Sequence, residues 1–115
     1  MEKLKKLVVA LDDKHLEDMV VLDMRNHSAL YDFMVITTAK NERIISGVLR
    51  ELKDVGAQPG FELKYIEGHH GAEWVLADFG DTVVHVFNEE MRAKYQLEKL
   101  WGDAPRLPLA EVLND

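Results

Sequence analysis

The chain contains no cysteine among its 115 residues. Disulfides, thiolate metal sites and cysteine nucleophiles are therefore excluded together, and a reducing, intracellular compartment is the expected setting. The chain also lacks an apolar run long enough to span a membrane, and the run within residues 4–11 is too short for the core of a signal peptide. We therefore expect a cytoplasmic protein with no membrane partner.

Basic residues are fewer than acidic ones. The chain has 14 lysines and arginines and 21 aspartates and glutamates, which gives a formal net charge of -7. Proteins that bind nucleic acid depend on lysine and arginine to release counterions from the phosphates. We therefore expect no direct nucleic-acid binding. Two interpretations of the acidity remain open, namely attraction to a basic protein partner and solubility alone.

The length allows one compact domain, since 47% of the residues are hydrophobic but the chain is too short for a cofactor domain plus a substrate domain. We place this single domain at residues 1–103. Residues 104–115 form a C-terminal tail whose apolar side chains either dock on the domain or mediate dimerisation. Those side chains are Leu107, Leu109, Val112 and Leu113.

Two helices are predicted by apolar residues at the i, i+3, i+4 and i+7 spacing. The first covers residues 4–11 and ends near Asp12. The second follows Asn41, a suitable N-cap, and ends at Gly56. Its apolar residues are Ile44, Ile45, Val48, Leu49, Leu52 and Val55.

The remaining apolar segments have the length and composition of strands, with a third helix after them. The order of elements is helix, two strands, helix, three strands, helix. This order predicts an α/β (α+β) domain in which helices pack on a single mixed five-stranded sheet. The predicted strands are 19–24, 33–38, 61–66, 74–79 and 82–87.

The last two strands form a hairpin if Gly80 and Asp81 are its two-residue loop, since glycine suits the first central position of a type II′ turn. Counting back from the turn gives the register and the two faces. One face is wholly apolar and should pack under helices; it carries Val75, Ala77, Val84 and Val86. The other pairs Trp74 with Phe87, Leu76 with His85, and Asp78 with Val83.

The mixed face has the composition of an interface centre, with an aromatic anchor and a polar fringe. Trp74 is the first candidate for a contact residue, and the alternative is that it closes the core. His85 is either a buried histidine bonded to Asp78 or Glu67, or a surface contact that titrates. The hairpin therefore predicts a docking surface rather than a catalytic pocket.

Catalytic and metal-binding interpretations find little support. The triplet Asp78-Phe79-Gly80 occurs in kinases, but the other kinase motifs are absent. The histidines near the hairpin lack the paired spacing of zinc sites; with Glu67 the candidate ligands are His69, His70 and His85. No carboxylate pair stands out as acid and base. We therefore expect no enzyme activity, no cofactor and no metal.

Several motifs occur together in order. They include Asp32-Phe33-Met34-Val35-Ile36, Glu67-Gly68, Trp74-Val75-Leu76, Asp78-Phe79-Gly80-Asp81, Val84-His85-Val86-Phe87 and Leu97-Glu98-Lys99-Leu100-Trp101. With this pattern the chain resembles the ribosomal silencing factor family, also called RsfS or Iojap-like, over residues 4–103. One segment departs from the family pattern. Where the family usually has a small residue, then glycine, then serine or asparagine at the start of the second helix, this chain has Ala39-Lys40-Asn41-Glu42-Arg43, and Ile44 replaces the histidine that often follows the arginine.

The resemblance implies a nucleotidyltransferase-like fold without catalytic residues. It also implies a protein that binds the large ribosomal subunit through its fourteenth ribosomal protein, which is basic, and sterically blocks joining with the small subunit. Translation would thereby be repressed under nutrient limitation, with a further role in large-subunit maturation. The partner-binding residues that it implies are Trp74, Leu76, Asp78, Glu67, Asp81, Tyr95, Glu98 and Trp101.

Two other functions remain alternatives. One is a degenerate nucleotidyltransferase-like enzyme, which would bind a nucleotide with a divalent metal and would need clustered carboxylates. The other is a homodimeric scaffold in large-subunit biogenesis, in which the Trp74 face pairs with a second copy. A homodimer of the free protein is also compatible with ribosome binding, because the two states would compete for one surface.

Overall fold

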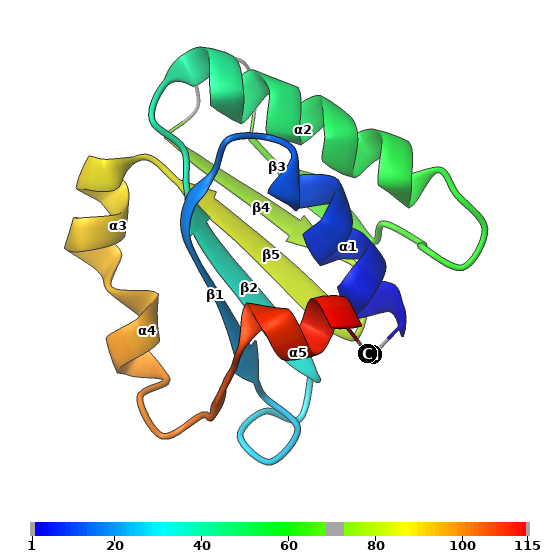
Figure 1. Ribbon diagram of the computed structural model, residues 1–115, viewed down its shortest axis with the longest axis vertical. Coiled ribbons are helices and arrows are strands. Elements are labelled where there is room, and N and C mark those ends of the chain that lie inside the picture. The colour runs from blue at the N-terminus through cyan, green and yellow to red at the C-terminus, as the bar shows by residue number, and fades with distance from the viewer. Residues whose placement is uncertain (1, 69–72, 115) are drawn as a thin grey trace.

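The computed structural model of the chain describes residues 2–68 and 73–114 (Figure 1). Its elements in chain order are α1 (Glu2–Asp12), β1 (Glu17–Asp23), β2 (Phe33–Thr38), α2 (Glu42–Gly56), β3 (Tyr65–Glu67), β4 (Trp74–Asp78), β5 (Thr82–Phe87), α3 (Glu89–Tyr95), α4 (Leu97–Leu100), β6 (Arg106–Leu107) and α5 (Leu109–Asn114).

The strands form one mixed sheet in the order β3-β4-β5-β2-β1-β6. β2 and β5 pair in parallel, and the other neighbouring strands pair antiparallel. The predicted α+β class with a mixed sheet is confirmed. The predicted count of five strands is wrong, because Arg106–Leu107 adds a sixth strand beside β1.

Two strand predictions failed for local reasons. β6 is two residues long between Pro105 and Pro108, so it shows no alternation of polar and apolar residues. β3 begins at Tyr65 instead of residue 61. The reason is that Phe61 is buried in the core beside the helices while the chain is still outside the sheet.

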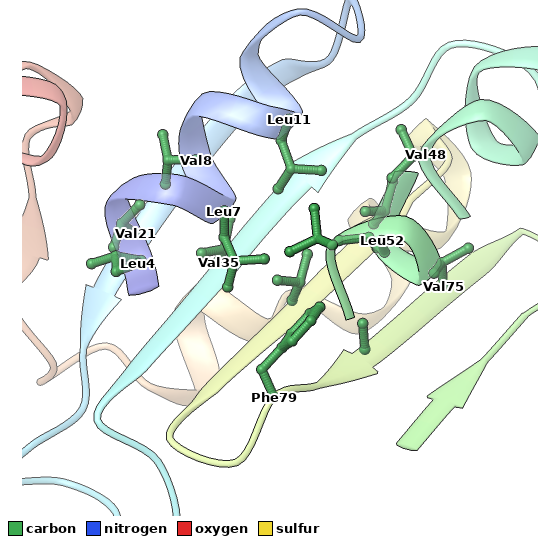
Figure 2. Packing of buried hydrophobic residues seen from close by; sticks show 14 of the residues in the cluster. Leu4, Leu7, Val8, Leu11, Val21, Val35, Val48, Leu52, Val75 and Phe79 are labelled. Atoms are coloured by element: carbon green, nitrogen blue, oxygen red, sulfur yellow. The ribbon is translucent and has the colours of Figure 1, made fainter. Parts of the chain in front are cut away.

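One face of the sheet is covered by α1, α2 and α5 (Figure 1). Figure 2 shows the resulting core, in which side chains of α1 and α2 meet the branched residues of the strands. The four hairpin residues predicted for this face lie in it, which confirms the assignment of the two hairpin faces. They are Val75, Ala77, Val84 and Val86.

The predicted N-cap of the second helix is confirmed, because the Asn41 side chain accepts a hydrogen bond from the Ile44 backbone N–H at 2.9 Å. Such a cap satisfies one of the backbone donors left free at a helix start. The buried face of α2 consists of Ile45, Val48, Leu49, Leu52 and Val55.

The C-terminal segment docks on the rest of the chain. Leu107 pairs with Val21 at the sheet edge, and Val112 of α5 is fully buried in the cluster that contains α1. Of the two alternatives for this tail, the structure shows docking within one chain.

A pair of α1 substitutions tests the helical layer. Leu7 is completely buried, whereas Val9 is 47% exposed on the same helix. Leu7→Ala should lower the free energy of unfolding by about 3 kcal/mol, because it removes buried methyl groups and leaves a cavity. Val9→Ala should change it by less than about 0.5 kcal/mol. Urea unfolding followed by circular dichroism would measure both, and equal losses would contradict this packing.

Candidate docking surface

The hairpin that carries the candidate residues has the predicted register. Trp74 lies opposite Phe87, Leu76 opposite His85, and Asp78 opposite Val83. Gly80 adopts a φ of 93°, which suits the first central position of the turn. The N–H of Phe79 donates to the carbonyl of Thr82 at 2.9 Å and closes that turn.

Four rings gather on the sheet face opposite the helical layer, and we call this group the aromatic face: Trp74, His85, Phe87 and Tyr95. The Trp74 ring centre lies 5.0 Å from that of Phe87 and 5.2 Å from that of Tyr95. Tyr95 comes from the end of α3, so a helix and two strands build the group together. These distances are those of favourable aromatic pairs.

The aromatic face is only partly covered. Phe87 is buried, Trp74 is partly exposed, and Tyr95 is 46% exposed. Trp74 and Leu76 pack at the margin of a second core cluster that lies under α3 and α4. Trp74 therefore has a buried side that serves the core and an accessible side that another molecule can contact.

The histidine of this face has a different partner from those predicted. The indole N–H of Trp74 donates to Nδ1 of His85 at 3.1 Å, so neither Asp78 nor Glu67 is the partner. The prediction was wrong because Asp78 is engaged elsewhere. Burial lowers the pKa of His85 to about 4, which keeps its imidazole neutral near neutral pH.

Asp78 holds the end of the hairpin with both carboxylate oxygens. Oδ1 accepts from the backbone N–H of Gly80 at 2.8 Å, and Oδ2 accepts from the hydroxyl of Tyr31 at 3.0 Å. Burial, followed by the hydrogen bond to the Asp78 carboxylate, raises the pKa of Tyr31. Asp78 thereby fixes the turn and the loop before β2. Sequence analysis did not single out Tyr31, and no local signal connects residues 47 apart.

Glu98 is also held inside the chain. Its Oε1 accepts from Nε of Arg92 at 2.9 Å, and a second nitrogen of Arg92 donates to the Thr38 hydroxyl at 2.8 Å. The Arg92 and Glu98 side chains are only 14% and 18% exposed. Between them, Gln96 adopts a left-handed φ of 47° where α3 passes into α4. The pair therefore braces this bend.

The other candidate residues occupy different places. Glu67 lies opposite Leu76 on the edge strand β3, next to the aromatic face. Trp101 packs against the second core cluster, as do Leu97 and Met91. Asp81 is at the hairpin turn, where it forms an ion pair with Lys3 of α1 at 3.4 Å, and so lies apart from the aromatic face.

Residues 2–68 and 73–114 contain no group of three or more metal-ligating side chains close enough to hold an ion. His69 and His70 lie outside the described residues. A hollow of about 650 Å³ opens between α1 and α2, on the helical side of the sheet, and none of the candidate residues line it. In the described parts of the chain no helix is long and apolar enough to cross a membrane.

Fold and surface together define a small α+β domain that packs α1, α2 and α5 on one sheet face and carries a partly exposed aromatic patch beside α3 on the other. The family described as "Ribosomal silencing factor during starvation" (RsfS) matches residues 1–115. The chain belongs to this family. Regulation of translation and association with the ribosome follow from that membership.

Individual relatives agree with this assignment. The chain is 45% identical over 113 residues to the ribosomal silencing factor RsfS of Halalkalibacterium halodurans, covering 98% of this chain and 97% of the relative. It is 44% identical over 111 residues to RsfS of Bacillus subtilis, covering 96% and 94%. A crystal structure of a Bacillus halodurans protein superposes with a TM-score of 0.79 at 42% identity, covering 94% and 99%.

The buried histidine predicts a pH-dependent stability. Because the folded pKa of His85 is about 4, against 6.5 for an unburied imidazole, the unfolded chain takes up a proton first as the pH falls. The His85 contribution should therefore be intact above about pH 6.5 and lost progressively toward pH 4. Between about pH 7.5 and pH 5 the lowered pKa of His85 should reduce the free energy of unfolding by about 2 kcal/mol.

Urea unfolding of the wild type and of His85→Asn at both pH values would measure this contribution as a difference. The carboxylates common to both chains cancel in that comparison. His27→Asn, at an exposed histidine, is the matched control and should follow the wild type. A wild-type slope that persists unchanged in His85→Asn would contradict the assignment.

Proposed function

We propose that this chain binds the large ribosomal subunit through the aromatic face and thereby sterically blocks joining with the small subunit, which represses translation under nutrient limitation. The partner is the fourteenth protein of the large subunit, which is basic, and the setting is the cytoplasm. The chain acts by binding alone, without enzyme activity or a cofactor. The observation that carries the proposal is the accessible aromatic cluster of Trp74 and Tyr95 in a chain of this family.

Charge and composition support a basic protein as the partner. The chain has a net charge of -7, and Glu67 borders the aromatic face at the sheet edge. Aromatic residues are common anchors at the centres of protein interfaces, and complementary charge speeds encounter and rejects wrong partners. The proposed contacts are Trp74 and Tyr95 of the aromatic face and Leu76, which lies beside it opposite His85.

The remaining proposed residues act mainly as supports. Asp78 and Glu98 are engaged with Gly80, Tyr31 and Arg92, so they position the hairpin and the bend after α3. Trp101 supports α4 from the second core cluster. Asp81 lies at the periphery. Because its carboxylate already forms an ion pair with Lys3, a basic side chain of the partner would have to share it with Lys3.

The size of the folded chain supports a steric mechanism. The folded chain measures 34 × 34 × 25 Å along its principal axes, so it is 25 Å thick even in its shortest direction. A body of this thickness on the surface that faces the small subunit would hold the two subunits apart. The location of the bound chain and its volume are then sufficient to block joining of the two subunits.

Leu76→Lys tests this function with little risk to the fold. The new lysine would lie opposite Glu67, where an oppositely charged cross-strand pair is tolerated, but it would present a cation to a basic partner. We expect the variant to remain folded and its binding to isolated large subunits to fall at least about tenfold. Co-sedimentation with purified large and small subunits would measure binding, and subunit re-association would measure the block.

Val9→Lys is the matched control, because it adds the same charge at an exposed position on the helical side. It should bind like the wild type. Equal binding by Leu76→Lys and the wild type would refute the docking surface. Failure of the wild type to bind large subunits would refute the function, and titration with nucleotide and Mg²⁺ would then test the enzyme alternative.

A further inference from the structure

The indole of Trp74 is the one ring of the aromatic face that both touches the other three and donates a hydrogen bond. The indole N–H is the only hydrogen-bond donor of a tryptophan side chain. In a buried or partly buried tryptophan this donor normally has an acceptor. His85 provides the acceptor from the neighbouring strand. Because His85 lies opposite Leu76, two residues before Phe87, which is the cross-strand partner of Trp74, this hydrogen bond runs diagonally across the β4–β5 pair.

The acceptor atom is fixed by its own surroundings. His85 is only 8% exposed, and its ring stacks on Phe87 with an interplanar angle of 4° and a centroid distance of 5.9 Å. For Nδ1 to accept, the imidazole must be neutral with its proton on Nε2. Burial lowers the pKa of His85, which favours the same neutral form. A buried acceptor whose ring stacks on Phe87 therefore faces an indole that is partly exposed.

We propose that His85 is a positioning residue for docking: its Nδ1 holds the indole of Trp74 in the orientation that the partner meets. This inference rests on the proposed function and deepens it. His85 need not touch the partner. It removes rotational freedom from Trp74 before the encounter, so that less conformational entropy is lost when the complex forms.

The geometry explains why the indole needs such a constraint. Phe87 and Tyr95 contact its ring with interplanar angles of 31° and 39°, which are tilted rather than fully stacked. Ring contacts alone allow several positions of the indole, because aromatic pairs are favourable in more than one arrangement and over a range of centroid distances. A directional hydrogen bond to the buried His85 acceptor selects one of them. Trp74 is then preorganised as an anchor.

Two variants of nearly equal side-chain size separate positioning from packing. His85→Asn places Oδ1 near the position of Nδ1 and keeps an acceptor for the indole N–H. His85→Leu fills a similar space without an acceptor. Circular dichroism and urea unfolding would first establish that both variants are folded.

The first readout uses the free protein. In ¹H–¹⁵N spectra the indole signal of Trp74, distinguished from that of Trp101 with Trp101→Phe, should exchange slowly with water in the wild type and His85→Asn. In His85→Leu the signal should shift and exchange at least about tenfold faster, as loss of a hydrogen bond of ordinary strength implies. An unchanged signal in His85→Leu would overturn the assignment of the acceptor.

The second readout is affinity for isolated large ribosomal subunits. His85→Leu should bind about tenfold more weakly than the wild type, whereas His85→Asn should bind within about threefold. Equal binding by His85→Leu and the wild type, or equal loss in both variants, would overturn the positioning role. If the wild type itself does not bind, the proposed function fails and the docking role of His85 fails with it, while the indole spectra still report whether His85 orders Trp74.

Discussion

The parallel pairing of β2 with β5 is the constraint on which the other elements depend. These two strands occupy the middle of the sheet, from Phe33 opposite Thr82 to Thr38 opposite Phe87, and all of their residues are buried. A parallel pair needs a long connection, and here α2 and the strands β3 and β4 lie within it. Alternating residues of β5 then point to opposite faces of the sheet, so that Val84 and Val86 meet the helices while His85 and Phe87 belong to the aromatic face.

The hairpin shows how far local sequence carries a prediction. Once Gly80 and Asp81 are placed in the turn, the period of two along each strand decides which residues share a face with Trp74. That step needed no knowledge of the rest of the fold, and the observed pairs agree with it. The helices were predictable for a similar reason, since Leu4, Leu7, Val8 and Leu11 recur at the helical spacing and are all buried.

Other features depended on contacts between distant residues. Tyr31 reaches Asp78 from a loop, and Arg92 joins Thr38 to Glu98 across two elements. Nothing near any of these residues in the sequence indicates such partners. The same is true of β6, which becomes a strand only because β1 offers it a free edge. Candidate residues could therefore be named from motifs, but their division into contacts and supports required the tertiary structure.

The docking of α5 on α1 has a consequence for synthesis of the chain. Helix α1 emerges from the ribosome before Val112, which belongs to the cluster that α1 covers. Until then the apolar stripe of α1 lacks part of its cover, and β1 has an unpaired edge where Leu107 will lie. Incomplete chains with exposed apolar surface and free strand edges are prone to aggregate. Residues 106–114 therefore protect the chain from association with other copies as well as completing its fold.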